Sequence, residues 1–236
     1  MVLTRQQRKN KGFTLAEVLI TLGIIGVVAA MTMPTLVNNS RNQECRAGLK
    51  AGYALISTAL NSMIADDMST RSGDYASREF TPVFRNYFKV GNKGGNYQDC
   101  KDNTIFITTE NSNNDPGDHD NEYRTYSKKN NIYTKFLDDG QFVLANGMLV
   151  AIENKEPPTI YISIDVNGKG KKPNVWGIDL FTFQLMENGK LLPMGAEGTD
   201  YDSEIYCDPA GESDINGIAC AVKAVSDDSY WRHLPN

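Results

Sequence analysis

Residues 11–34 read KGFTLAEVLITLGIIGVVAAMTMP, and this stretch decides the fold. Its apolar run from Phe13 to Met33 has 21 residues. An α-helix rises about 1.5 Å per residue, so a helix of this length spans the roughly 30 Å hydrocarbon core of a bilayer. Glu17 lies inside the run, where a carboxylate in a membrane helix costs about 2.5–3.5 kcal/mol at the helix centre. Glu17 therefore needs a partner or a special role.

The charge distribution sets the topology and the number of domains that we expect. Four basic residues and no acidic residue precede the apolar run: Arg5, Arg8, Lys9 and Lys11. The positive-inside rule then places residues 1–12 in the cytoplasm and the chain after Pro34 outside. Without these four residues, 20 basic side chains face 29 acidic ones, a formal charge of −9. Such a balance argues against a surface that binds nucleic acid, and 236 residues suit one anchor and one domain.

An ordinary secretory signal peptide is the alternative interpretation of the N-terminus. The string VVAAM offers small residues at Val28 and Ala30 for cleavage before Met31. However, the apolar run is longer than a usual signal core, and a signal peptide has no use for Glu17 or for the Gly12-Phe13 pair at its start.

The string GFTLAEVLI, residues 12–20, resembles the N-terminal processing motif of type IV pilins and of the pseudopilins of type II secretion. In that family a membrane aspartyl peptidase cuts after the glycine and methylates the new N-terminal residue. The resemblance implies cleavage between Gly12 and Phe13 and methylation of Phe13. Counted from Phe13, the family's glutamate at position five is Glu17, and its helix-bending proline at position twenty-two is Pro34.

The resemblance also implies partners and a location. We expect identical or related pilin subunits, a prepilin peptidase and an inner-membrane assembly platform as partners. The chain would start as a single-pass protein of the bacterial inner membrane, with its C-terminus outside, and then enter a periplasmic or cell-surface filament.

Two roles for Glu17 are compatible with the sequence. Cleavage would expose a cationic amine on Phe13, and the Glu17 carboxylate of a neighbouring subunit could neutralise it; removing one partner of such a buried pair leaves the other charge uncompensated. Alternatively, Glu17 serves the N-terminus of its own helix, where the macrodipole favours an acidic residue.

Residues 35–66 predict an amphipathic continuation of residues 13–34, the transmembrane and filament-core helix. Apolar residues recur there mostly three or four positions apart, namely Cys45, Leu49, Tyr53, Ile56, Leu60, Met63 and Ile64. Gly48 and Gly52 interrupt this half and are candidate bends. Residues 67–236 then form an extracytoplasmic globular domain.

Strand patterns follow in the second half of the chain. QFVLANGMLVAI, residues 141–152, contains Asn146-Gly147, which is typical of a type I′ hairpin turn. Apolar and polar residues alternate over residues 160–166 and 181–185, which predicts half-buried strands, and Asn188-Gly189 turns the second into KLLPMG. The prediction is an α+β fold of the type IV pilin kind, with the long N-terminal helix packed on four or five sequential antiparallel strands.

Two loops offer candidate cation sites. Residues 165–179 connect two predicted strands and carry four oxygen ligands suited to calcium, namely Asp165, Asn167, Asn174 and Asp179. Lys169 and Trp176 occupy positions five and twelve, so the loop is no EF-hand, and a hydrogen-bonded turn is the alternative. The polar residues 111–123 predict a surface loop, where His119 with Asp115, Asp118 and Asp120 forms either a weak cation site or a solvated acidic cluster.

The four cysteines all lie on the predicted outer side, where disulfides form. Four cysteines allow three connectivities. Cys207 and Cys220 bracket a loop of little regular structure and are the natural pair, which resembles the C-terminal disulfide loop of many pilins. Cys45 with Cys100 is the remaining pair, unless Cys45 is a buried thiol.

The sequence favours a structural protein over an enzyme. Its two histidines, His119 and His233, lie far apart, and we find no phosphate-binding loop, nucleophile elbow or paired-carboxylate motif. We expect no catalytic residue and no cofactor other than the candidate calcium. The alternative is a membrane-anchored extracytoplasmic binding protein that does not polymerise.

Overall fold

The computed structural model describes residues 13–76, 78–92, 107, 119–155 and 159–235. The chain divides into two compact units, Met1–Arg41 and Asn42–Asn236. Helix α1, Leu15–Ala65, begins in the first unit and ends in the second. It ends in a Schellman motif, because Met68 N–H donates to the Met63 carbonyl (2.8 Å) and Asp67 adopts a positive φ of 56°.

The second unit is built on a six-stranded antiparallel sheet of order β1-β4-β5-β6-β7-β8. Its strands are β1 (Val90–Asn92), β4 (Gly140–Leu144), β5 (Leu149–Lys155), β6 (Thr159–Asp165), β7 (Leu180–Leu185) and β8 (Leu191–Pro193). The last five follow one another in sequence as a meander. The predicted α+β class and the antiparallel sheet are confirmed, and the arrangement is consistent with a type IV pilin-like fold.

Both Asn-Gly pairs lie in hairpin turns, as predicted. The predicted type I′ turn at Asn146-Gly147 is wrong, because the Gly147 N–H donates to the Leu144 carbonyl and Asn146 has no positive φ, which a type I′ turn requires. Gly147 connects β4 to β5 with a φ of 91°, and Gly189 connects β7 to β8 with a φ of 78°. Glycine adopts these left-handed conformations without the steric cost that a Cβ atom brings. The turns therefore fix the register in which β4 pairs with β5, with Phe142 opposite Val150.

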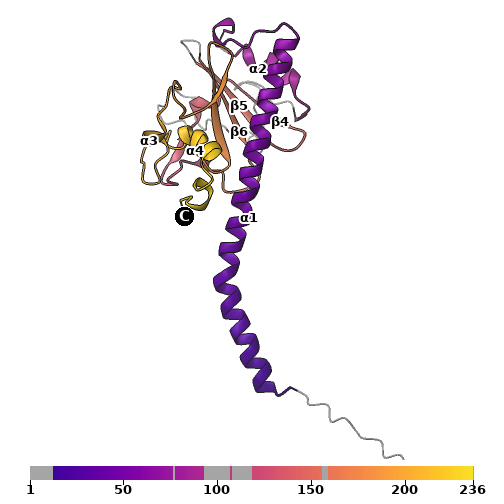
Figure 1. The fold of residues 1–236 in the computed structure, drawn as a ribbon, viewed down its shortest axis with the longest axis vertical. Helices are drawn as coiled ribbons and strands as arrows, with labels where there is room; N and C mark the ends of the chain where they lie inside the picture. Colours follow the sequence, from indigo (N-terminus) through magenta and orange to yellow (C-terminus); the bar gives the residue numbers. More distant parts are fainter. Residues whose placement is uncertain (1–12, 77, 93–106, 108–118, 156–158, 236) are drawn as a thin grey trace, which may run out of the picture. The chain divides into compact units, whose positions relative to one another are not determined.

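From Asn42 onward, α1 lies against one face of this sheet (Figure 1). The buried side of this part of the helix includes Cys45, Leu49, Ile56, Leu60 and Met63, as the periodicity predicts. The prediction was wrong for Ile64, which is 54% exposed. Met63 takes the core position, and the next residue points about 100° further around the helix, toward solvent.

Gly48 and Gly52 lie where the helix closely approaches the sheet. A Cβ atom on Gly48 would lie 2.9 Å from the Val166 Cβ, and one on Gly52 would lie 2.8 Å from the Ile164 Cδ1. Both distances are shorter than a van der Waals contact between carbons. The two glycines thus let the backbone of α1 approach the end of β6, and Tyr53 stacks on Phe183 beside them at 5.2 Å between ring centroids.

The second face of the sheet is also covered. Strand β7 is buried along its whole length, and β6 is buried from Ile160 to Asp165. The prediction of half-buried strands was therefore wrong. A second apolar cluster covers this face and joins sheet residues to distant segments: Tyr123 and Ile132, Leu149, Ala151, Tyr161 and Leu180, and Trp176, Met194, Ile218 and Ala219.

The remaining helices and strands lie outside the six-stranded sheet. The helical ones are η1 (Ser72–Asp74), α2 (Phe80–Phe84), η2 (Arg85–Tyr87), η3 (Thr134–Phe136), α3 (Ser203–Tyr206), η4 (Ile218–Cys220), α4 (Ala221–Ser226) and η5 (Tyr230–Arg232). Strands β2 (His119–Arg124) and β3 (Asn131–Tyr133) form a separate antiparallel pair. The loop predicted for residues 111–123 is thus wrong from His119 onward, because Tyr123 and Ile132 anchor this pair in the second cluster.

Candidate functional site

The first candidate site is the start of α1. Thr14 precedes the helix, and its backbone N–H and its hydroxyl both donate to Glu17 Oε2, each at 2.8 Å. In return, the Glu17 N–H donates to Thr14 Oγ1 at 3.2 Å. This reciprocal pattern is a capping box, which satisfies amides that a helix start otherwise leaves without an acceptor. The T-x-x-E spacing of Thr14 and Glu17 signals this capping box in the sequence, in addition to the two roles predicted for Glu17.

The capping box leaves one carboxylate oxygen for another partner. Both bonds from Thr14 end on Oε2, and a carboxylate offers acceptor sites on two oxygens. The two predicted roles of Glu17 therefore do not exclude each other geometrically. Phe13, whose amine is the predicted second partner, is 88% exposed. Gly12 lies outside the described residues, so cleavage between Gly12 and Phe13 stays a prediction.

The apolar first half of α1 exposes its side chains. Ten large apolar residues between Val18 and Met33 are 41–74% exposed, namely Val18, Leu19, Ile20, Leu22, Ile24, Ile25, Val27, Val28, Met31 and Met33. Within the described residues, α1 is a helix that is long and apolar enough to cross a membrane. Exposed apolar surface of this extent is typical of a segment that contacts lipid or another helix.

Pro34 lies inside α1, and the helix continues to Ala65. Proline has no N–H to donate to the carbonyl four residues earlier, so its position is a weak point of the helix. The predicted bend at Pro34 stays a prediction.

Comparison with known proteins locates one match at this N-terminal region. A family model described as the prokaryotic N-terminal methylation motif matches residues 7–33. The chain carries this motif. One curated relative, the type IV major pilin protein PilA of Myxococcus xanthus (strain DK1622), is 34% identical over 80 residues, which are 33% of this chain and 34% of that protein. The match thus spans about a third of the relative's length, and no solved structure matches the chain. The resemblance found in residues 12–20 is confirmed by the methylation motif.

The second candidate site is the connection between β6 and β7, which brings together all four predicted calcium ligands. Asp165 accepts hydrogen bonds from Tyr123 and from the amides of Asn167 and Gly168. Asp179 accepts from the amides of Asn174 (2.8 Å) and Val175 (2.7 Å) and from the Asn167 side chain (3.3 Å).

This arrangement matches the hydrogen-bonded turn more directly than a metal site, because N–H and O–H donors already occupy the carboxylates. Burial raises the pKa of both aspartates, and the charge of Asp179 raises that of Asp165 further. The amide oxygens Oδ1 of Asn167 and Asn174 are buried without a hydrogen-bond donor. Amide oxygens of this kind can serve as calcium ligands, and calcium binding by this connection stays a prediction.

The predicted disulfide between Cys207 and Cys220 is present, with a Cα–Cα distance of 4.9 Å. It packs against the β6–β7 connection, because a Cβ atom on Gly177 would lie 2.8 Å from the Cys220 sulfur. The Tyr230 hydroxyl donates to the Gly177 carbonyl nearby. The disulfide thus closes the loop between α3 and η4, and Cys220 packs beside the β6–β7 connection.

The other two cysteines stay untested as a pair. Cys45 is buried in the core, 2% exposed, and Cys100 lies outside the described residues. Asp115 and Asp118 also lie outside them, so the second candidate cation site is untested too.

A third acidic cluster was missed by sequence analysis. Oxygen atoms of Asp138, Asp139 and Glu153 lie within 4.8 Å of one another. Arg78 Nε binds Asp139 Oδ1 at 3.0 Å, and burial raises the pKa of Asp138 to about 6. Residues 138–139 precede β4 and Glu153 lies on β5, so the pairing of Gly140 with Ile152 brings them together. Predicting this cluster requires the register of β4 against β5, which the sequence pattern alone does not give.

Proposed function

We propose that the chain is a structural subunit of a type IV pilus or of a type II secretion pseudopilus. The methylation motif at residues 7–33, which includes an apolar helical segment whose side chains are exposed, is the observation that carries this proposal. A helix of this kind needs lipid around it before assembly and other helices around it afterwards. A filament of subunits supplies the second environment.

Processing belongs to the same proposal. A prepilin peptidase cleaves between Gly12 and Phe13 and methylates the Phe13 amine. The subunit then sits in the inner membrane with its second unit outside, and an assembly platform moves it into a periplasmic or surface filament. Glu17 Oε1 accepts a hydrogen bond from the cationic Phe13 amine of a neighbouring subunit, while Oε2 keeps its hydrogen bonds from Thr14. The carboxylate of each subunit thus neutralises the amine of the next.

Mass spectrometry of sheared filaments tests the function. We expect the mature chain in the filament fraction and little of it there from cells that lack the peptidase. Retention of the whole pool in the inner membrane, with residues 1–12 still attached, would instead favour the alternative of an anchored binding protein. No catalytic role is part of the proposal, since the relative with the matching segment is named a pilin.

A further inference from the structure

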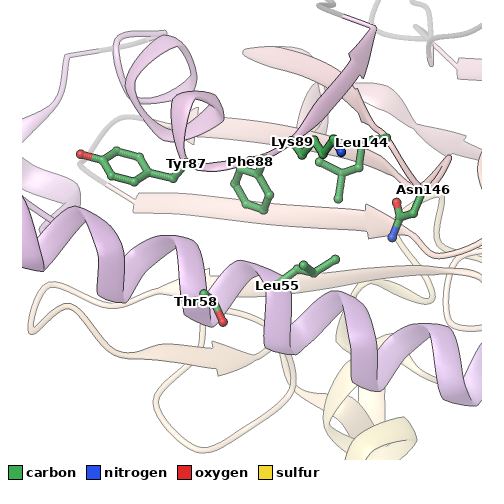
Figure 2. Close-up of a pocket in the computed structure, with 8 residues that line it drawn as sticks. Leu55, Thr58, Tyr87, Phe88, Lys89, Leu144 and Asn146 are labelled. Atoms are coloured by element: carbon green, nitrogen blue, oxygen red, sulfur yellow. The ribbon is translucent and has the colours of Figure 1, made fainter.

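The second unit has an apolar groove, and neither the methylation motif nor the packing of the sheet assigns a role to it. Its cavity measures about 260 Å³ and is lined by Leu55, Thr58, Tyr87, Phe88, Lys89, Leu144, Ala145 and Asn146. Figure 2 shows Leu55 and Thr58 on α1 across from Phe88, with Leu144 and Asn146 toward one end and Tyr87 at the other. Leu55 is 38% exposed beside it. The groove is therefore a concave apolar surface open to a partner.

The same unit carries an exposed apolar side chain elsewhere. Among the described residues after Arg41, Ile205 on α3 is the most exposed large apolar side chain, at 63%. It lies on α3 between the disulfide-bonded segment and the turn after β8. An isoleucine side chain is small enough to enter the groove, where its burial would remove apolar surface from water on both sides.

The charges around the two surfaces are complementary. Among the described residues, Lys89 is the one charged residue that lines the groove. Ile205 is flanked by the exposed acidic residues Asp202 and Glu204. Glu204 binds Lys223 at 2.9 Å, yet its side chain stays 79% exposed and accessible to a second cation. Opposite charges at the rim of an apolar contact favour encounter in one orientation.

The two surfaces lie on opposite sides of the unit. The groove adjoins β1 and β4 at one edge of the sheet, whereas α3 follows β8, which is the other edge. Figure 1 shows α3 and β4 on opposite sides of β5 and β6. A symmetric pair of chains cannot fill both grooves when the surfaces point apart. A contact of this kind is heterologous and repeats along an open chain of copies.

We infer that Ile205 of one copy of this chain inserts into the Leu55–Phe88–Leu144 groove of the next copy. The inference rests on the proposed filament, for which it names the contact between the second units. It adds an apolar anchor with an acidic rim to the contacts that the N-terminal helices make. The contact is directional, because each copy offers Ile205 on one side and the groove on the other.

Cross-linking between separately tagged chains tests the inference. Full-length chains with Ile205→Cys and with Thr58→Cys are expressed together and mildly oxidised, both in intact membranes and in sheared filaments. We expect a dimer that contains one copy of each tag and a peptide that joins positions 58 and 205. The matched control replaces Ile205→Cys by Val225→Cys, which changes an apolar residue of 39% exposure on α4.

A second variant measures how much the contact contributes. We expect Ile205→Glu to reduce filament yield about tenfold, which corresponds to about 1.4 kcal/mol per contact, and Val225→Glu to leave it unchanged. Filaments in which the 58–205 dimer is no more abundant than the control dimer overturn the inference and leave the proposed function standing. If the unsubstituted chain forms no filaments, the proposed function fails, and the cross-link in membranes alone decides the inference.

Discussion

Replacing Glu17 with glutamine separates the two roles of this side chain. Glutamine keeps an oxygen where Glu17 Oε2 accepts two hydrogen bonds from Thr14, and glutamine is as suitable as glutamate at this position of a capping box. The helix start is therefore preserved. The negative charge is lost, so the Phe13 amine of a neighbouring subunit would be left without a counter-charge in an apolar helix bundle.

The expected size of the effect follows from that loss. Removing one partner of a buried ion pair costs about 3–5 kcal/mol, which is a factor of about a hundred or more in subunit incorporation. The matched variant Thr14→Ala removes the capping hydroxyl and keeps the carboxylate. Loss of an N-cap side chain costs about 1 kcal/mol, or about fivefold. Loss of the charge should thus reduce subunit incorporation more than ten times as strongly as loss of the capping hydroxyl.

The assay measures three quantities for each variant expressed as the sole subunit: the amount of chain in the membrane, the fraction cleaved after Gly12, and the amount in sheared filaments. We expect the first two to stay near the unsubstituted level for Glu17→Gln, because Gly12 and Phe13 are unchanged, while the filament fraction falls about a hundredfold. Normal filament yield from Glu17→Gln would refute the reasoning and would show that Glu17 serves only its own helix.

Four further predictions concern processing, the disulfide and the β6–β7 connection. N-terminal analysis of the mature chain should find methylated Phe13, whereas a chain that begins at Met31 would reveal an ordinary signal peptide. Reducing the disulfide, or replacing Cys207 and Cys220 with serine, should lower the free energy of unfolding of the full chain in detergent by about 3 kcal/mol; an unchanged denaturation midpoint would contradict this. Burial raises the native pKa of Asp165, so its contribution to stability is fully present below about pH 4 and is lost as the pH rises through that native value. In a calcium-free buffer, Asp165→Asn should therefore flatten the pH dependence of the unfolding free energy above pH 4, and an unaltered slope would show that another group titrates. If the same connection binds calcium, the ion at a hundred times its dissociation constant should stabilise the chain by about 2.7 kcal/mol, whereas no change in the unfolding midpoint would leave only the hydrogen-bonded turn.

The β6–β7 connection illustrates where sequence reasoning stops. The sequence supplies Asp165 and Asp179 in one loop, and the oxygen atoms invited a calcium interpretation. The structure directs backbone amides of the loop at both carboxylates and adds Tyr123 from β2. Which donors reach a carboxylate depends on the path of the backbone and on a strand more than 40 residues away. Neither is encoded in the spacing of the ligands.

The sequence by itself determined the features that depend on near neighbours along the chain. These are the apolar helix with its methylation motif, the two Asn-Gly hairpins and the amphipathic stripe of α1, because helical and strand periodicity and turn chemistry are local properties. Pairing of Cys207 with Cys220 was also accessible, since the two lie only 13 positions apart in the sequence.

Only the tertiary structure decided which surfaces are covered. The alternation in β6 and β7 predicts one polar face, yet Tyr161, Ser163 and Thr182 are buried, because the second apolar cluster lies over them. The groove beside Leu55 likewise joins segments that are far apart in sequence. A local sequence pattern determines toward which face of its own strand or helix a side chain points. Whether that face is buried depends on the distant segments that pack against it, because burial is a property of the whole folded chain.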